Sequence, residues 1–162
     1  MGIGGKYGFI DKTGKIVIKP QFDVKSAFYE GLAPEKSGGK YGFIDKTGKF
    51  VIKPQFDDAW SFYEGLAPVK IGGKWGFTDK TGKIVIKPQF DFIWGFHEGL
   101  CSVEIDGKEG YIDKTGKIVI NPQFDMAGVF KEGLAPVGFG YGAKIKWGYI
   151  DKTGKYIWKP TR

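Results

Sequence analysis

The repeated element D-K-T-G-K contains residue types that occur in several active sites. D-K-T-G opens the loop of P-type ion pumps in which the aspartate is phosphorylated, and aspartic proteases carry a related Asp-Thr-Gly. Here the element starts at Asp11, Asp45, Asp79, Asp113 and Asp151, without the further motifs and Mg²⁺ site of a phosphoryl-transfer enzyme. The inserted lysine also breaks the protease pattern. Asp at the first position and Gly at the last are typical of a tight turn, so we predict five turns.

Other side chains that commonly carry catalysis or bind metal ions are few. His97 is the only histidine and Cys101 the only cysteine, whereas a zinc site needs several such ligands. Cys101 stands where other repeats carry alanine, which favours a small buried residue over a nucleophile. Four glutamates lie one repeat apart, too far for paired acid–base catalysis, and each is expected to bond a turn amide or a lysine. They are Glu30, Glu64, Glu98 and Glu132. We therefore predict no catalytic, cofactor-binding or metal-binding residues, and a protein that is not an enzyme.

These residues recur because the chain is an internal repeat. The tripeptide Lys-aromatic-Gly starts at Lys6, Lys40, Lys74 and Lys146, with a degraded copy at Lys108. The successive spacings are 34, 34, 34 and 38 residues, and the extra four residues lie in the segment 138–142. A fixed period of this length indicates a repeat architecture. The chain is thus predicted to be a single repeat array, with repeats at approximately 1–31, 32–65, 66–99, 100–133 and 134–162.

The repeat at residues 66–99 shows how each element is expected to form. Two short strands are joined by Gly72-Gly73, a pair that can adopt positive φ at both positions of a hairpin turn. A third, β-branched strand follows, and Pro88 is expected to end it because proline lacks an amide donor. The sequence thus predicts a three-stranded antiparallel meander, followed by a connection at residues 89–99 whose aromatic residues cover its face.

The predicted fold is all-β, with about fourteen strands in five sheets. The first sheet is expected to lack one strand, because only Ile3 precedes the first Lys-Tyr-Gly hairpin. A closed propeller usually completes its last blade with a strand from the other terminus, and its blades are commonly four-stranded and longer. Tandem three-stranded repeats in an open solenoid-like array are therefore favoured, with a closed five-bladed propeller-like ring as the alternative.

The ten residues K-W-G-F-T-D-K-T-G-K from Lys74, followed by P-Q-F at Pro88 and E-G-L at Glu98, resemble the bacterial WG repeat, also called the KWG repeat. The resemblance extends over essentially the whole chain. It implies an array of β units that mediates interactions, and it brings no catalytic residues with it. Glu109 departs from the pattern, because a carboxylate stands where the motif has an indole. The fourth repeat is therefore expected to be locally exposed or to make a different contact.

Composition and charge limit the remaining classes of function. Hydrophobic residues make up 41% and aromatic residues 17% of the 162 residues, which is enough for a folded core. The net charge is +7, but Arg162 is the only arginine, and sequence-specific nucleic-acid binding favours arginine, so such binding is not expected. No run approaches the ~20 apolar residues of a membrane span. No signal peptide is visible, which slightly favours the cytoplasm over other locations.

Recurring aromatic residues such as Trp75 and Trp147 are expected in the core, whereas contacts with partners are expected from residues that vary between repeats. The candidate interaction surface consists of Tyr29, Trp60, Tyr63, Trp94, His97, Glu109 and Tyr141. We predict a non-catalytic scaffold for protein–protein interaction or self-assembly, with homo-oligomers forming through unpaired terminal strands. The alternative is binding of an anionic polymer or cell-wall glycan through exposed aromatic residues and lysine rows at Lys12, Lys15, Lys19 and their equivalents.

Overall fold

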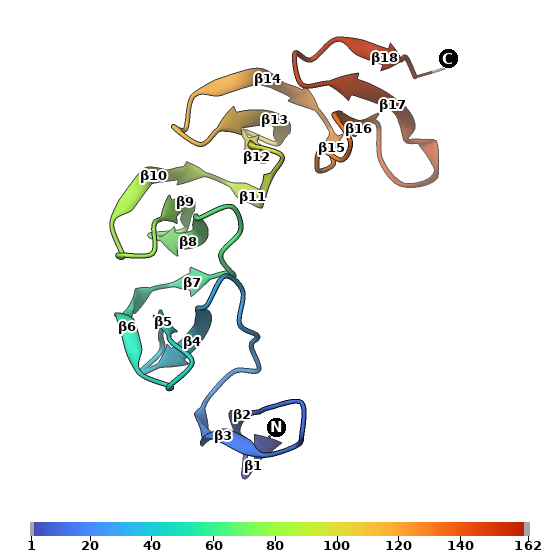
Figure 1. The fold of residues 1–162 in the computed structure, drawn as a ribbon. Coiled ribbons are helices and arrows are strands. Elements are labelled where there is room, and N and C mark those ends of the chain that lie inside the picture. Colours follow the sequence, from blue (N-terminus) through green and yellow to red (C-terminus); the bar gives the residue numbers. More distant parts are fainter. Residues whose placement is uncertain (1, 161–162) are drawn as a thin grey trace. The chain divides into compact units, whose positions relative to one another are not determined.

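The computed structural model describes residues 2–160, which form several small antiparallel β-sheets (Figure 1). The chain divides into two compact units. Unit 1 contains the residues up to Gly73 together with Phe77–Ile84, and unit 2 contains Lys74–Gly76 together with the residues from Val85 onward. Arg162 lies outside the described residues.

Each sheet is built from strands in chain order, and each has two edge strands. The first contains β1 (Gly2–Ile3), β2 (Lys6–Ile10) and β3 (Ile16–Phe22), and the second contains β4 (Ala33–Ser37), β5 (Lys40–Ile44) and β6 (Phe50–Phe56). The third contains β7 (Asp58–Ala59), β8 (Ala67–Ile71), β9 (Lys74–Thr78) and β10 (Ile84–Phe90). The fourth contains β11 (Phe92–His97), β12 (Leu100–Ile105), β13 (Lys108–Asp113) and β14 (Ile118–Phe124). The fifth contains β15 (Met126–Ala127), β16 (Leu134–Phe139), β17 (Lys146–Asp151) and β18 (Tyr156–Trp158).

In the described part of the chain, helical structure is limited to one short 3-10 turn, η1 (Gly142–Lys144), in the segment that contains the extra residues of the last repeat. Across residues 2–160, no helix combines the length and the apolar character that a membrane crossing requires.

The all-β prediction is confirmed, but the predicted number of strands was too low. Residues 2–160 contain eighteen strands, and three of the five sheets have four strands each. The expectation that the first sheet lacks a strand was also wrong. The short β1 pairs with β2 through Gly2↔Tyr7 and Ile3↔Lys6, which completes a three-stranded sheet.

The additional strands come from the connections between meanders. Strands β7, β11 and β15 each add to the edge of the meander that follows them in the chain. Backbone hydrogen bonds extend this pairing, with Trp60 N donating to Pro68 O (3.0 Å) and Gly128 N to Pro136 O (2.8 Å). The first connection differs, because residues 23–28 form no strand and the second sheet therefore keeps three strands.

In the first four meanders proline does not end the third strand, as the sequence had suggested, but lies inside it. Pro122 lies inside β14, at a bulge between the pairs Glu109↔Phe124 and Tyr111↔Ile120. Two residue steps along β13 are matched by four along β14, so part of β14 bows away from the ladder. The missing amide donor of Pro122 falls in this unpaired part, where the ladder needs none. The bulges at β2–β3 and β5–β6 have the same spacing.

The glycine of Lys-aromatic-Gly is explained by the same bulge. A Cβ atom on Gly110 would lie 2.5 Å from Ile120 O and 2.6 Å from Pro122 N, far inside van der Waals contact. Only glycine allows the two backbones to approach this closely. The motif glycine is therefore required by packing.

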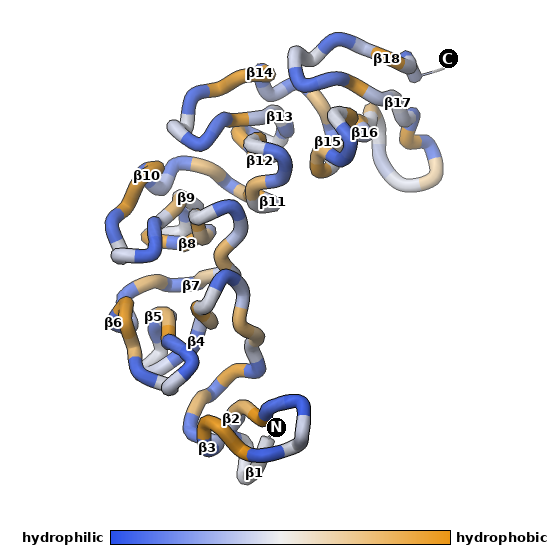
Figure 2. The backbone as a smooth tube through the Cα atoms, in the orientation of Figure 1, coloured by the Kyte–Doolittle hydropathy of each residue, from blue (hydrophilic) through white to orange (hydrophobic). Residues whose placement is uncertain are grey.

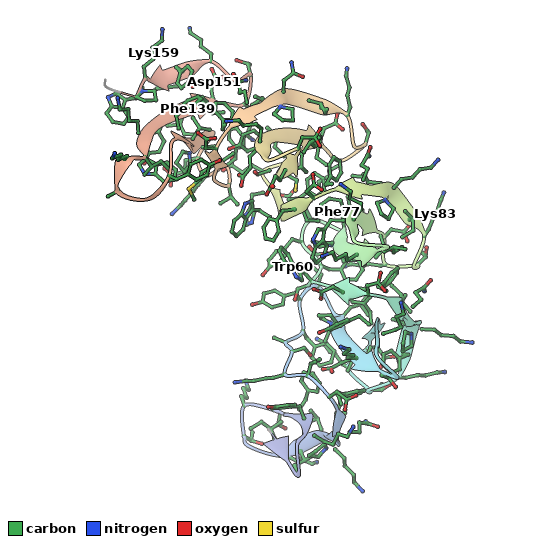
Figure 3. All side chains as sticks on the ribbon, turned by 180° about the vertical axis from the view of Figure 1, so that it is seen from behind. Trp60, Phe77, Lys83, Phe139, Asp151 and Lys159 are labelled. Atoms are coloured by element: carbon green, nitrogen blue, oxygen red, sulfur yellow. The ribbon has the colours of Figure 1, made fainter. Side chains whose placement is uncertain are left out.

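Each unit has its own hydrophobic core. In unit 1 the buried cluster includes Phe43, Phe56 and Phe62, and in unit 2 it includes Tyr111 and Phe124. Figure 2 shows hydrophobic residues concentrated on strands such as β6 and β10, with hydrophilic residues in the turns. The side chains in Figure 3 follow this division, since Phe77 has no exposed surface whereas Lys83 is exposed.

Candidate functional site

The aspartates of D-K-T-G form hydrogen bonds within their own turns. The Asp45 carboxylate accepts hydrogen bonds from Thr47 N (2.8 Å), Thr47 Oγ1 (2.6 Å) and Lys49 N (3.2 Å), and Gly48 N donates to Asp45 O (2.9 Å). The hydrogen bond from the Thr47 hydroxyl is the main cause that lowers the pKa of Asp45. The other four copies make the same contacts. The prediction of turns is confirmed.

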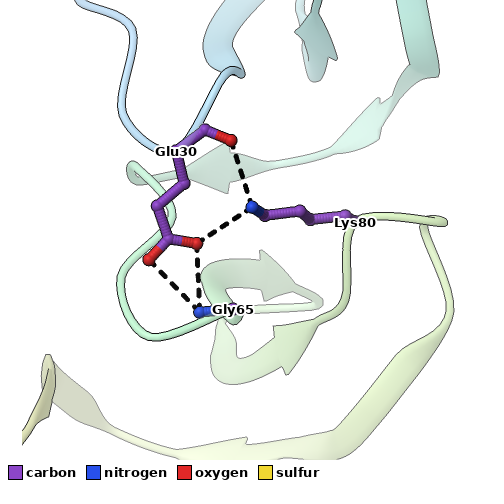
Figure 4. A network of polar contacts seen from close by, with 3 residues as sticks. All are labelled: Glu30, Gly65 and Lys80. Carbon is purple, nitrogen blue, oxygen red and sulfur yellow. Dashed lines mark hydrogen bonds and ion pairs between the residues drawn. The ribbon is translucent and has the colours of Figure 1, made fainter.

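The glutamates of E-G-L join repeats that are distant in the sequence. The Glu30 carboxylate accepts a hydrogen bond from Gly65 N, at 3.1 Å from Oε2, and forms an ion pair with Lys80 at 3.1 Å. Lys80 Nζ also donates to the backbone carbonyl of Glu30 at 3.1 Å (Figure 4). All three residues belong to unit 1. One carboxylate therefore links the first repeat to the second and the third.

Unit 2 repeats this arrangement around Glu98. Its carboxylate accepts hydrogen bonds from Glu132 N (2.6 Å) and Gly133 N (3.0 Å) and pairs with Lys152 (3.1 Å). The expectation that these glutamates bond a turn amide or a lysine is confirmed at Glu30 and Glu98. Both residues have positive φ, 49° and 51°, a backbone conformation that glycine or asparagine adopts more easily. The glutamate side chain therefore stabilises a turn that its own backbone disfavours.

Many lysines are engaged in the same way. The lysine of Lys-aromatic-Gly pairs with the aspartate of P-Q-F-D in Lys6–Asp23, Lys40–Asp57 and Lys74–Asp91, and Lys108 of the degraded copy pairs with Asp125. Lys80 and Lys152 belong to the predicted lysine row at the Lys12 position, yet they bond Glu30 and Glu98. Two members of that row therefore stabilise contacts between repeats.

Cys101 is buried, as expected from its place among alanines. Burial raises the pKa of its thiol to about 12, which keeps the sulfur protonated and unreactive at neutral pH.

The structure brings together some of the predicted surface residues. Tyr29 and Tyr63, both in unit 1, are exposed and stack with ring centroids 5.1 Å apart. Trp60 is half-buried in the same unit (Figure 3). In unit 2, Trp94 hydrogen-bonds the Glu109 carboxylate, so these two residues form one site.

The other two predicted residues do not join these groups. His97 is half-buried at the end of β11 and pairs through its backbone with Leu100. Tyr141 is the most exposed large hydrophobic residue of the described part of the chain, and its hydroxyl donates to Asp125 Oδ1 at 3.2 Å.

Each unit contains a hollow at the same place in the repeat. The unit 1 hollow has a volume of about 560 Å³, and the unit 2 hollow one of about 190 Å³. Six positions of the two linings correspond at an offset of two repeats, in the pairs Ser26/Trp94, Tyr41/Glu109, Asp58/Met126, Ala59/Ala127, Trp60/Gly128 and Ser61/Val129. The position is thus hollow in both units, while the side chains around it differ.

Glu109 is the polar centre of the unit 2 hollow. Its Oε2 accepts hydrogen bonds from Ala127 N (2.7 Å) and Ser102 Oγ (3.2 Å), and Trp94 provides a further hydrogen bond. Burial raises the pKa of Glu109, and these three hydrogen bonds oppose the rise. Glu109 is therefore held by hydrogen bonds within its own unit.

Trp147 was assigned to the core from its recurrence, and this was wrong. Its side chain is 39% exposed and lines the unit 2 hollow, whereas Trp75 at the equivalent position is 3% exposed. Gly128, which also lines the hollow, stands where the two preceding repeats carry Trp60 and Trp94. A glycine in place of an indole was the available sequence signal that this part of the last hairpin is uncovered.

A fully buried carboxyl group at another position was not anticipated. Glu35 has no exposed surface and stands where the three following repeats carry Val69, Val103 and Val137. Ser26 hydrogen-bonds one of its oxygens, and within residues 2–160 the other oxygen has no hydrogen-bond partner. Burial raises the pKa of Glu35 to about 7. Glu35 and the half-buried Glu109 are thus each accompanied by a serine that other repeats lack.

Comparison with known families agrees with this repeat structure. The family model described as WG containing repeat matches residues 7–41, 41–75, 75–108 and 110–140. A comparison with curated proteins found no match. The four matches follow the repeat period and span most of the chain, and the hairpin from Lys146 carries the same motifs beyond them. The chain therefore belongs to the family of proteins built from WG-containing repeats.

Proposed function

We propose that this chain is a non-catalytic repeat scaffold that binds other proteins, or further copies of itself, through side chains that differ between its repeats. The observation that carries the proposal is the pair of equivalent hollows, one in each unit, with different linings. Repeat proteins commonly keep a constant frame and vary the residues on one surface, which is how one architecture serves different partners.

The recurring polar side chains support this distinction between a constant frame and a variable surface. The D-K-T-G aspartates hold turns, Glu30 and Glu98 join repeats, and the motif lysines pair with aspartates. Side chains engaged in this way have few groups left for a reaction or a ligand. What remains for contact is the variable set, including Trp60, Trp94 and the stacked tyrosines.

Self-assembly is supported by a different observation. Strand β18 is an edge of the fifth sheet, and it exposes Ile157 (57%) and Trp158 (50%). An exposed apolar edge is a surface onto which another strand can add. Light scattering after size-exclusion chromatography is expected to show concentration-dependent oligomers. Ile157→Lys should abolish them, whereas Val119→Lys, at the same position of the preceding repeat, should not. A monomer at every concentration would exclude this form of the proposal.

Binding of an anionic polymer or cell-wall glycan is the second candidate function. The lysines that remain exposed along the third strands favour it, whereas the engagement of Lys80 and Lys152 weakens the predicted row. Retention on heparin that falls steeply with added salt, and that Lys15→Gln and Lys19→Gln reduce together, would support this candidate. Retention that is unaffected by salt would exclude it.

The proposal of protein partners is tested by site-specific photocrosslinking in the cells that produce the protein. A benzophenone amino acid is placed at Trp60 in the unit 1 hollow, at Trp94 in the unit 2 hollow, and at Lys12 in a turn as the control. Discrete adducts from the hollow positions, identified by mass spectrometry and missing from the turn position, are expected. Equal labelling from all three positions would contradict a role for the hollows.

A further inference from the structure

The unit 2 hollow combines aromatic surface with a single carboxylate. Trp94 and Trp147, which are 49% and 39% exposed, line it together with Met126, Val129 and Glu109. Apart from Glu109, the lining side chains are aromatic or aliphatic. Its volume of about 190 Å³ suits one small group or one side-chain terminus. Two indole rings and one carboxylate therefore determine which ligand the hollow can bind.

The charge of Glu109 is not neutralised by the groups that bind it. Its hydrogen-bond donors are the Ala127 backbone N–H, the Ser102 hydroxyl and the Trp94 side chain, and all three are uncharged. These donors fix the position of the carboxylate but leave its negative charge in the hollow. A cation is the ligand that such a carboxylate would stabilise.

The position of Trp94 is set by an irregularity of its strand. Ile93 pairs with Val103 and Gly95 with Ser102, so Trp94 is the extra residue of a β-bulge in β11. A bulge redirects the side chain of the extra residue. The Phe92 ring packs edge-on against the indole, with centroids 5.1 Å apart. The indole is thereby held against the hollow, where its π face can attract a cation.

The hydrogen bonds of Glu109 also indicate which kind of cation would fit. A carboxylate has about four lone-pair positions, and three hydrogen bonds already reach Glu109. A primary ammonium would need several acceptors to replace its water shell, and the apolar lining offers few. A quaternary ammonium has no N–H donor, is weakly hydrated, and presents methyl groups to aromatic rings.

We propose that the unit 2 hollow binds a quaternary alkylammonium group, with Trp94 and Trp147 against its methyl groups and Glu109 as the counter-charge. The group can belong to a free choline-like compound or to a trimethylated lysine side chain, and both present the same N-trimethyl chemistry. This inference goes beyond the proposed scaffold function and does not depend on it, because it concerns a ligand and not an assembly.

The experiment uses the full chain and small probes of stated structure. The indole N–H resonance of Trp94 is followed by NMR during titration with choline, with N-acetyl-trimethyllysine methylamide, and with the unmethylated lysine analogue. The neutral isostere 3,3-dimethyl-1-butanol has the shape of choline without its charge. Saturable shifts are expected with choline or the trimethyllysine probe, and an affinity about tenfold or more weaker with the isostere.

Variants connect binding to the named side chains. Glu109→Gln keeps the shape of the side chain and removes its charge, and Trp147→Ala removes one ring; each should weaken binding about tenfold. Trp60→Ala in unit 1 is the matched control and should leave binding unchanged, and the amide spectrum of each variant reports whether it is folded. Equal binding of choline and its isostere would overturn the proposal, as would stronger binding of unmethylated lysine or no saturable shift with any probe. A difference between choline and the trimethyllysine probe would identify the source of the group, and failure here would leave the crosslinking test of the scaffold function unaffected.

Discussion

Lys80 Nζ lies 3.1 Å from a carboxylate oxygen of Glu30 and 3.1 Å from its backbone carbonyl oxygen, although fifty residues separate the two in the sequence. The same carboxylate accepts a hydrogen bond from Gly65 N. A glutamate in a left-handed turn is thus stabilised by contacts with each of the next two repeats.

Replacing Lys80 with methionine is expected to lower the free energy of unfolding of the protein by about 1 kcal/mol or less. The pair is partly exposed, and such pairs contribute little individually. Urea denaturation at low and high salt measures the effect, which should be smaller at high salt. Lys12→Met is the control, because Lys12 occupies the same motif position without an E-G-L turn two repeats before it. An equal loss in both variants would show that the lysine acts through its own turn.

Glu35→Val is expected to stabilise the protein above neutral pH. The pKa of Glu35 is raised from 4.5 to about 7, so its buried neutral form favours folding below about pH 4.5. That contribution is lost as the pH rises through about 7, because the folded protein first has to keep a proton that the unfolded chain releases and then has to bury the charged carboxylate. The stability difference between variant and wild type should grow by about 3 kcal/mol over this range.

Urea denaturation of both proteins between pH 4 and pH 8 measures this difference. Taking the difference between the two proteins removes the effects of all other titrating groups, which both share. A constant difference across the range would show that Glu35 titrates normally in the folded state.

Gly110→Ala is expected to destabilise the protein by more than about 2 kcal/mol, because the new methyl group meets the backbone of β14 at the bulge. Gly133→Ala tests a different effect in the same repeat. Gly133 has φ +79° but no atom within 4 Å of a Cβ, so only the backbone conformation opposes alanine, at about 1 kcal/mol. Thermal and urea denaturation should rank the two variants in this order. The reverse order would contradict close backbone approach as the reason for the motif glycine.

Thr47→Val is expected to raise the pKa of Asp45 toward its ordinary value, because the Thr47 hydroxyl is the main cause that lowers it. A lowered pKa stabilises the folded protein above the ordinary value of 3.8, and this stability is lost as the pH falls. The variant should therefore lose less stability on acidification. Titration of side-chain carboxyl resonances by NMR measures the pKa directly. Thr78→Val should leave the pKa of Asp79 unchanged, since Thr78 bonds only carbonyl oxygens.

Local chemistry made part of the fold predictable. The Asp45 turn depends on residues within four positions of each other, and its residue types specify it. The role of Glu30 was predictable in kind, because a glutamate that recurs at a turn without a catalytic partner is expected to bond an amide or a lysine. The identity of that lysine was not predictable, since Lys80 is brought close only by the stacking of repeats.

The errors have a common physical cause, which is that pairing partners are not local. Pro122 has the sequence signature of a strand end, but the partner strand contributes a glycine that allows a bulge. Met126 and Ala127 contain no strand pattern of their own and pair only because β16 offers an edge. Strand formation at these positions is decided by the neighbouring strand and not by propensity.

The candidate site was predictable only in part. Trp94 and Glu109 were identified because their positions vary between the repeats, and the structure places them in one hollow. Trp147 was missed because a recurring residue was assumed to have a recurring environment. Glu35 was missed because a single buried carboxyl group leaves no periodic pattern, although a glutamate at a valine position was visible in the alignment of the repeats.

The contact between Glu98 and Lys152 has a consequence for how such a chain can change its length. These residues are 54 positions apart, against 50 for Glu30 and Lys80, because the extra residues at 138–142 lie between them. Each carboxylate nevertheless meets its lysine at 3.1 Å. The extra residues in the hairpin loop therefore lie outside the contact and leave its distance unchanged. After duplication or loss of a whole repeat, a glutamate with two repeats following it would again have an equivalent lysine two repeats ahead, so the gene can lengthen or shorten by whole repeats while such a glutamate keeps the same kind of bond.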